Sequence, residues 1–389
     1  MPVYLDYAAS APLDPAVREV MSARQAQPGN ASATHAFGRD CRQAVDGARR
    51  EVAAFLGCET EEVLFTSGAT EANVAAVRSA LDIGARAARR SGVRARIIVS
   101  TLEHASVSVA AESAAERLGI ELVRLPTDSS AHVDAAALVR ELTPETVFVA
   151  VMWVNNVLGS IQPVAEIGRA VAAERARRGP GGLPLLFHCD AVQAATTIAI
   201  DLKETAADTL SVSAHKLGGP QGVGALYLRR GTAWEPLLTG GGQEHGRRSG
   251  TENVVGIVGF GEAVRLADVR RKATAQHLEG LRQRLIGGLA GFGGRLALAG
   301  PSDGRVPGIV YLVSRRFTGD VLALKLDTLG FAVSSGSACD AGKRKTSPVL
   351  TAVLGEKAGR HAGVRVSFGP ATSPEDVGAL LAALRDCGV

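Results

Sequence analysis

Two segments of this sequence combine a polar or reactive side chain with small residues that would leave room for a ligand. From Thr66 to Glu71 a glycine turn separates an apolar run from a helical pattern, and free N–H groups at such a helix start can hold a phosphate. Lys216 follows a predicted strand, where loss of water would make its amine nucleophilic toward an aldehyde. An ordinary helix N-cap explains the first pattern about as well, and a solvated loop lysine is the alternative for the second.

Two further segments supply an acid and a thiol. Asp190 follows the apolar run 187–189, where a carboxylate could pair with the ring nitrogen of a cofactor, and a helix N-cap is an equal alternative. Cys339 ends a Gly/Ser segment and precedes basic residues 343–345, whose charge would lower the pKa of the thiol if the loop brings them near. The same basic cluster is otherwise only a solvated loop. We predict that the other cysteines, at positions 41, 58, 189 and 387, are inert packing residues.

A parallel α/β sheet must position these segments. Between Val63 and Tyr227, short β-branched runs alternate with longer Ala-rich helical patterns, which is typical of such a sheet with crossover helices. Strands are expected at 63–66, 97–100, 147–151, 185–188, 209–212 and 224–227, and a crossover helix at 134–142 with Asp134 as its N-cap.

The chain changes character at the Gly-rich stretch 240–250, after which a helix is expected from 252 to about 267. Beyond it the patterns predict a smaller α+β domain. Its expected strands are 308–313, 331–334 and 364–368, and its expected helices are 320–329 and 374–385.

Composition limits the class of protein. A chain of 389 residues with 46% hydrophobic but only 4% aromatic residues predicts two domains with interiors of small aliphatic side chains. A net charge of +4 without a long basic run argues against nucleic acid as a direct ligand, and no segment is predicted to enter a membrane. Five cysteines without a CxxC pair argue against disulfides and a metal site, and indicate reduced thiols in the cytoplasm.

In order and spacing, these segments resemble the cysteine desulfurases, which are fold-type I pyridoxal 5′-phosphate (PLP) enzymes related to class V aminotransferases. Besides the four segments above, the resemblance is carried by 4–10, 29–32 with His35, 101–106, 155–156, 240–251 and 364–367. It implies the α/β fold of fold-type I PLP-dependent transferases, with a mostly parallel seven-stranded sheet. The large PLP-binding domain would be 15–255, and 1–14 with 256–389 would form the small α+β domain that carries the Cys339 loop.

The resemblance also implies roles for individual residues. Lys216 would carry PLP as a Schiff base, Cys339 would accept sulfur, and His104 would stack on the ring as the third catalytic residue. Arg365 would grip the substrate carboxylate beside Asn155, a task that suits a planar guanidinium. Asp190 would pair with the pyridine nitrogen and Gln193 with the ring oxygen, and the phosphate would be held by Ala69, Thr70, Ser213, His215 and Thr251. Asn155 would also contact the cofactor.

The implied reaction converts L-cysteine to L-alanine and leaves a persulfide on Cys339. A sulfur-acceptor protein would then receive the sulfur for iron–sulfur cluster assembly, tRNA thiolation or a related pathway. A homodimer is implied, because Thr251 would reach the site of the other subunit. Departures from the family pattern are the residues 340–345, Val157 where an acid is common, and an end 24 residues after Arg365 without the scaffold-docking extension of housekeeping members.

Other functions remain open from the residues alone. A selenocysteine lyase or an aminotransferase could use the same fold and cofactor. A more distant alternative is a non-catalytic PLP-binding partner that relays sulfur. The loop thiol Cys339 discriminates among them, because an aminotransferase has no need for it and a selenocysteine lyase can cleave its substrate without it.

Overall fold

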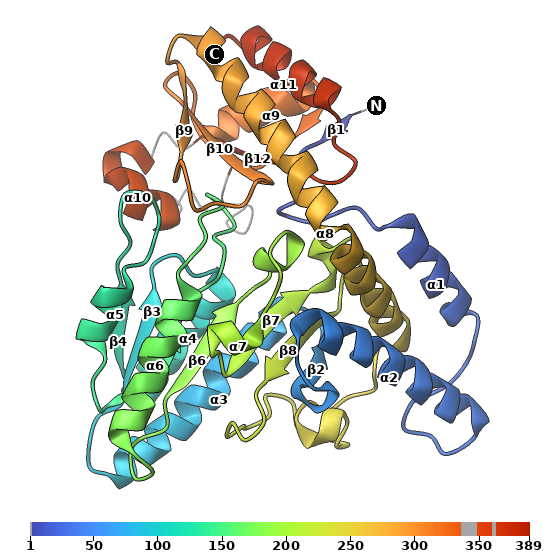
Figure 1. Ribbon diagram of the computed structural model, residues 1–389, viewed down its shortest axis with the longest axis vertical. Coiled ribbons are helices and arrows are strands. Elements are labelled where there is room, and N and C mark those ends of the chain that lie inside the picture. Colours follow the sequence, from blue (N-terminus) through green and yellow to red (C-terminus); the bar gives the residue numbers. More distant parts are fainter. Residues whose placement is uncertain (1, 336–347, 360–362) are drawn as a thin grey trace.

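The main feature of this computed structural model, which describes residues 2–335, 348–359 and 363–389, is a seven-stranded sheet (Figure 1). Every neighbouring pair of its strands is parallel except the two pairs that β8 makes with β2 and β7. This confirms the predicted mostly parallel sheet of the α/β fold. Its strands, in spatial order, are β2 (Val63–Thr66), β8 (Gly224–Leu228), β7 (Thr209–Ser213), β6 (Leu186–Asp190), β5 (Thr146–Ala150), β3 (Arg96–Ser100) and β4 (Glu121–Leu125).

Helices cover both faces of this sheet, so its central strands are buried on both sides. Successive side chains of β3 point to opposite faces: Ile97 and Val99 pack in the cluster that contains residues of α3 and α4, and Ile98 packs in the cluster that contains residues of α2 and α6. The helices of this part are α1 (Pro15–Gln25), α2 (Ala36–Leu56), α3 (Ala69–Arg90), α4 (Ala105–Leu118), α5 (Ala135–Glu141), α6 (Val164–Arg178) and α7 (Leu202–Thr205).

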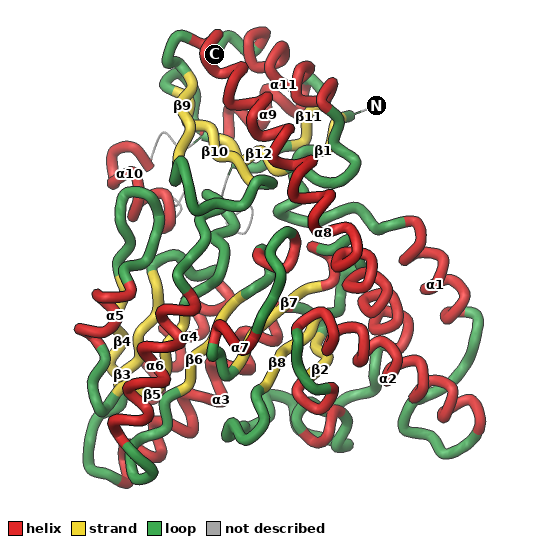
Figure 2. Tube along the Cα trace, in the orientation of Figure 1, coloured by secondary structure: helices red, strands yellow, loops and turns green. Residues whose placement is uncertain are grey.

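A second core is built around a small antiparallel sheet in the order β12-β10-β9 (Figure 2). The helix α8 runs from the large sheet to this second core, and strand β1 reaches it from the start of the chain by pairing with β11. The domain boundaries at 14/15 and 255/256 stay a prediction. The elements here are β1 (Val3–Tyr4), α8 (Val254–Gly288), β9 (Leu296–Ala299), β10 (Ile309–Ser314), α9 (Gly319–Thr328), β11 (Phe331–Ala332), α10 (Pro348–Gly359), β12 (Val364–Ser367) and α11 (Pro374–Asp386).

Short 3-10 helices complete the described part of the chain, and η3 is the one that carries Lys216. Their bounds are η1 (Thr60–Glu62), η2 (Ala194–Thr196), η3 (Ala214–Lys216), η4 (Glu244–Gly246) and η5 (Leu289–Phe292). Among the residues that the structure describes, no helix combines the length and the apolar character that crossing a membrane requires.

The helix expected to end near 267 is wrong at its C-terminal end, because α8 continues to Gly288. Leu278, Leu281 and Leu285 recur at helical spacing in its second half and pack into the core of the small sheet. The helix therefore joins two separate apolar segments, one ending at Val264 and one beginning at Leu278, through a polar stretch in which no residue is buried. By contrast, the predicted N-cap at Asp134 is confirmed, since its side chain accepts a hydrogen bond from the Ala136 amide at 2.8 Å.

A buried ion pair ties the Gly-rich stretch to the large sheet. Arg49 on α2 donates to both carboxylate oxygens of Glu244, at 2.8 and 2.6 Å, and both side chains are buried. The same carboxylate accepts the Phe65 amide of β2 at 3.0 Å. Glu244 and His245 have φ values of 49° and 58°, which are costly for residues other than glycine. The ion pair therefore helps to hold a strained turn in place.

Replacing this carboxylate should destabilise the fold strongly. Glu244→Gln would leave the Arg49 guanidinium buried without a counter-charge, and we expect a loss of about 3–5 kcal/mol in the free energy of unfolding. Urea denaturation followed by circular dichroism measures the change. Glu262→Gln is the matched control, because it removes a carboxylate that pairs with Arg265 at the surface of α8. Equal losses in the two variants would contradict the expectation.

Candidate active site

A cavity of about 1160 Å³ opens where the carboxyl ends of β3, β6 and β7 meet the start of α3. Ligands of parallel α/β sheets bind at this edge, because the loops that leave the strands converge there. Asp190 and Ser213 reach it as the last residues of β6 and β7, and Arg365 reaches it from β12 of the small sheet. The fold therefore brings residues that are far apart in the sequence to one cavity.

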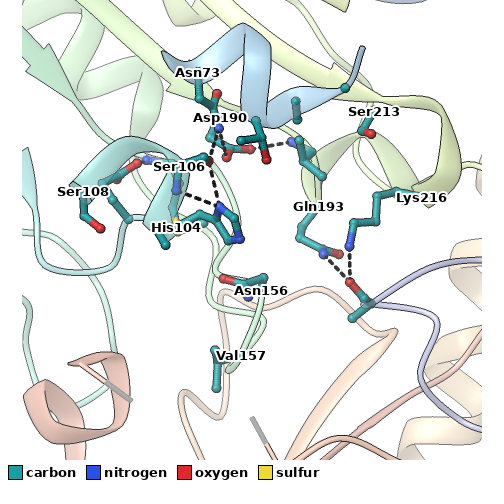
Figure 3. Close-up of a pocket in the computed structure, with 18 of the residues that line it drawn as sticks. Asn73, His104, Ser106, Ser108, Asn156, Val157, Asp190, Gln193, Ser213 and Lys216 are labelled. Atoms are coloured by element: carbon teal, nitrogen blue, oxygen red, sulfur yellow. Dashed lines mark hydrogen bonds between the residues drawn. The ribbon is translucent and has the colours of Figure 1, made fainter. Parts of the chain in front are cut away.

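Lys216 occupies one side of this cavity (Figure 3). Its Nζ donates to the carbonyl oxygens of Ala8 and Ala9, at 2.6 and 2.7 Å. The Gln193 side-chain amide donates to the same Ala8 oxygen at 2.9 Å. The interpretation of Lys216 as a solvated loop residue is therefore wrong, and the segment after β1 forms part of the wall that faces the amine.

Asp190 is buried deeper in the cavity, and both of its carboxylate oxygens are held. Oδ1 accepts the Val192 amide at 3.0 Å, and Oδ2 accepts the side-chain amide of Asn73 at 2.8 Å. The first bond closes a turn directly after β6, and the next helical segment begins only at Ala194. The alternative in which Asp190 is a helix N-cap is therefore wrong.

The start of α3 faces the cavity with N–H groups that are suited to an anion. Its N-cap is Gly68, which has no side chain to satisfy the first N–H groups of the helix, and Ala69 and Thr70 line the cavity. The N-cap alternative for this segment thus lacks the side-chain bond that defines it. Gly68 also sits against β8, where a Cβ at Gly224 would come within 2.9 Å of its backbone.

Ser213 and His215 line the same cavity from the end of β7. Burial and then the neighbouring charge of Lys216 lower the pKa of His215 to about 4. The imidazole is therefore neutral near pH 7, and its Nδ1 lies 3.2 Å from the hydroxyl of Ser10. A neutral imidazole still offers one N–H donor to an anion.

His104 faces the cavity as the N-cap of α4, and its Nδ1 accepts the Ser106 amide at 3.1 Å. Glu103 beside it is a residue that sequence reasoning missed. Its Oε1 accepts the Ser100 hydroxyl and the Met152 amide, both at 2.7 Å. Burial raises the pKa of Glu103 to about 7, with a smaller contribution from the charge of Asp190. Glu103 therefore places another carboxyl group in the wall of the cavity, near Asp190.

Arg365 is held by two partners that the sequence did not reveal. Its guanidinium donates to Asp6 Oδ1 and to the Asn156 carbonyl oxygen, each at 2.8 Å. Its Nε is buried and has no hydrogen-bond partner among the described residues. Each terminal nitrogen carries a second N–H, and the guanidinium lines the cavity, so it is suited to an incoming carboxylate.

Three of the predicted site residues are not found in the described cavity wall. Asn155 is fully buried, and its Oδ1 accepts the Val157 and Leu158 amides at 3.0 and 2.8 Å, so Asn156 lines the cavity in its place. Thr251 is exposed and lies outside the cavity lining of this chain. Cys339 lies outside the described residues. The remaining predicted residues, Ala69, Thr70, His104, Asp190, Gln193, Ser213, His215, Lys216 and Arg365, all line one cavity.

Three of the four described thiols are poor nucleophiles. Burial raises the pKa of Cys58 to about 12, and it also raises the pKa values of Cys189 and Cys387. A raised pKa leaves little thiolate near pH 7. Within the described ranges, no group of three or more His, Cys, Asp or Glu side chains is placed to hold a metal ion.

The donor set fits PLP. The uncapped start of α3, the hydroxyls of Thr70 and Ser213 and the His215 imidazole suit its phosphate. The Asp190 carboxylate suits its ring nitrogen, and the Lys216 amine suits its aldehyde. These groups line a single cavity with room for such a ligand.

Comparisons with known proteins find relatives that match nearly the whole chain. The family described as aminotransferase class-V matches residues 3–380. A cysteine desulfurase of Bradyrhizobium diazoefficiens is 39% identical over 387 residues, which are 99% of this chain and 94% of that protein. The cysteine desulfurase IscS of Dictyoglomus turgidum is 37% identical over 376 residues, which are 96% of this chain and 91% of that protein. The solved structure of a NifS-like protein has a TM-score of 0.88 and 30% identity, and 99% of each chain is covered.

Proposed function

This chain belongs to the class-V aminotransferase family, and from that membership we propose that it is a PLP-dependent cysteine desulfurase. It converts L-cysteine to L-alanine and holds the released sulfur as a persulfide on Cys339. The observation that carries the proposal is the single cavity lined by Lys216, Asp190, His104 and Arg365. An amine, an acid, an imidazole and a guanidinium in one cavity are the groups that amino-acid chemistry on PLP requires.

The cofactor would be held by residues whose chemistry suits its parts. When bound, PLP supplies an aldehyde for an amine and a protonated ring that draws electrons from the α-carbon of an amino acid. The Asp190 carboxylate would keep the ring nitrogen protonated. Ala69, Thr70, Ser213 and His215 would hold the phosphate, and Gln193 would bind the ring oxygen.

Substrate binding and proton transfer would fall to three residues. Arg365 would bind the carboxylate of L-cysteine through the second N–H of each terminal nitrogen, while Asp6 and the Asn156 carbonyl oxygen hold the guanidinium in place. Lys216 Nζ would hold the cofactor and, once free, remove the α-proton of the substrate. His104 would lie against the ring from the side of α4.

Sulfur transfer would take place at Cys339. Its thiolate attacks the sulfur of the substrate, a new S–S bond forms, and the C–S bond breaks with its electron pair on the carbon fragment. That fragment takes up protons and leaves as L-alanine. One thiol and one cysteine thus give one persulfide and one alanine, without an external oxidant.

Family membership also supports proposals for the oligomeric state, the sulfur acceptor and the location of the enzyme. The enzyme acts as a homodimer in which Thr251 completes the phosphate site of the partner subunit, and its exposure in the single chain supports this. A sulfur-acceptor protein takes the persulfide sulfur for iron–sulfur cluster assembly, tRNA thiolation or a related pathway. The cytoplasm is the proposed location, since the reaction needs a reduced thiol.

A direct assay tests the proposal. Purified protein reconstituted with PLP should be yellow, and it should form alanine and reducible sulfur from L-cysteine in equal amounts. Alanine without sulfur would exclude the function, as would transfer of the substrate amine to a keto acid. A much higher rate with L-selenocysteine than with L-cysteine would instead indicate a selenocysteine lyase.

Arg365→Lys should weaken substrate binding more than the chemical step. Lysine keeps the charge but loses the planar donors that pair with a carboxylate, so we expect KM for L-cysteine to rise about 10- to 100-fold with a smaller change in kcat. Initial-rate kinetics measure the two constants. Arg385→Lys on the exposed side of α11 is the matched control. An unchanged KM in Arg365→Lys would remove this residue from the substrate site.

A further inference from the structure

Asn73 lines the cavity and links β6 to α4 through hydrogen bonds, although it does not carry out any step of the proposed reaction. It lies in the first turns of α3, and its side chain is buried. Its Nδ2 donates to Asp190 Oδ2 at 2.8 Å and to Ser106 Oγ at 2.9 Å (Figure 3). Its Oδ1 lies 3.0 Å from His188 Nε2. One amide therefore contacts the acid on β6, the segment that carries His104, and a buried histidine.

The orientation of this amide follows from the chemistry of its partners. A carboxylate only accepts hydrogen bonds, so the nitrogen of Asn73 must face Asp190 and the oxygen must face His188. His188 must then carry its proton at Nε2, and its Nδ1 accepts the Thr209 hydroxyl at 2.9 Å. Burial lowers the pKa of His188 to about 4, which agrees with a neutral ring that has a single proton. His188 thus holds Asn73 in one of its two amide orientations.

The same reasoning fixes the proton of His104. Ser106 Oγ accepts from Asn73, so its own hydrogen is free to point at His104 Nδ1, 2.7 Å away. The Ser106 amide also donates to this nitrogen, at 3.1 Å. A proton on Nδ1 would face that N–H, which would place two donors against each other. In a neutral ring the proton must therefore be on Nε2.

We propose that Asn73 is a positioning residue that orients Asp190 and, by turning the Ser106 hydroxyl toward His104 Nδ1, supports the Ser106 amide in holding His104 as its Nε2–H tautomer. His104 then presents its donor on the side of the ring that faces the cavity rather than toward α4 (Figure 3). A donor at Nε2 can hydrogen-bond to an anionic group in the cavity, and one at Nδ1 cannot. The meaning of this arrangement for catalysis rests on the proposed function, whereas the hydrogen bonds themselves do not.

Nitrogen-15 NMR of protein labelled in its histidines tests the tautomer directly, in both the PLP-free and the PLP-bound protein. A His104→Gln spectrum identifies the signal. We expect Nδ1 of His104 to show the shift of an unprotonated nitrogen and Nε2 that of a protonated one. A protonated Nδ1 would overturn the assignment. Once the signal is identified, this measurement on the unaltered chain is decisive even if Asn73→Ala fails to fold.

Asn73→Ala tests the positioning role. The variant lacks the donor that turns the Ser106 hydroxyl toward His104 Nδ1, whereas the Ser106 amide still donates to that nitrogen. The His104 Nδ1 signal should therefore shift as one hydrogen bond weakens, while the proton stays on Nε2. We expect kcat to fall about 10- to 100-fold with little change in KM, because Arg365 is untouched. Gln162→Ala is the matched control, since Gln162 is another buried amide, bonded to Val133, Ala131 and Ser160, and it is not part of the cavity wall.

Each result separates the positioning role from the proposed function. An unchanged His104 signal and kcat in Asn73→Ala would overturn the role of Asn73. If the tautomer is as assigned and L-cysteine is not consumed, the proposed function fails and the hydrogen-bond assignment stands. If L-cysteine is converted and Nδ1 carries the proton, only the assignment fails.

Discussion

Lys216→Ala is expected to leave a colourless protein that no longer releases sulfur from L-cysteine. The amine has two proposed tasks, to hold the aldehyde of PLP and to remove the α-proton, and the variant loses both. General acid–base catalysis alone contributes roughly 10²–10⁴-fold, so we expect turnover to fall at least about 10³-fold. Absorbance of the PLP-reconstituted protein and alanine formation measure the two effects.

Two further variants distinguish this role from a structural one. Lys216→Arg keeps a positive charge that can reach the carbonyl oxygens of Ala8 and Ala9, but a guanidinium is not nucleophilic near pH 7. It should therefore be as inactive as the alanine variant. Lys203→Ala removes an exposed lysine from α7 and should keep colour and activity. If Lys216→Arg retained the wild-type absorbance and turnover, the proposed role of the amine would be wrong.

The parts of the fold that depend on local pattern could be predicted from the sequence. The six strands expected in the large sheet correspond to β2, β3, β5, β6, β7 and β8 within a residue or two at their ends. Their runs are buried on both faces, which gives continuous apolar stretches. Strand β4 was missed because it lies at the edge of the sheet, where Glu121 and Arg124 interrupt the apolar run. Strand β1 was missed because two residues are too short to give a pattern.

In the candidate site, the sequence could predict the functional residues but not the residues that hold them in place. Motifs identified residues by their type and position, but not the partners that orient them. Asp6 lies 359 positions from Arg365 in the sequence, and Asn73 lies 117 positions from Asp190, so only the folded chain reveals these pairs. The Asn155-Asn156 pair shows the same limit at short range. Both side chains are polar and adjacent, and the turn sends Asn155 inward while Asn156 lines the cavity.

The thiol is the residue on which the choice among PLP enzymes depends, and its loss should have the other large effect. Cys339→Ala would remove the group that attacks the substrate sulfur, so we expect release of sulfur from L-cysteine to fall roughly 10³-fold or more. The absorbance of bound PLP should stay as in the wild type, because the groups proposed to hold PLP are untouched. Alanine formation and trapping of persulfide on the protein measure the effect.

The other cysteines provide the control for this prediction. Cys58 is only partly buried, but its raised pKa, about 12, makes its thiolate scarce near pH 7, so Cys58→Ala should desulfurate L-cysteine at the wild-type rate. Comparison of two substrates then separates the enzyme classes. If Cys339→Ala loses L-cysteine turnover but keeps L-selenocysteine turnover, the thiol is needed for sulfur alone, as the persulfide route requires. If both substrates react at full rate without Cys339, sulfur must leave by another path, and the chain is a lyase rather than a desulfurase.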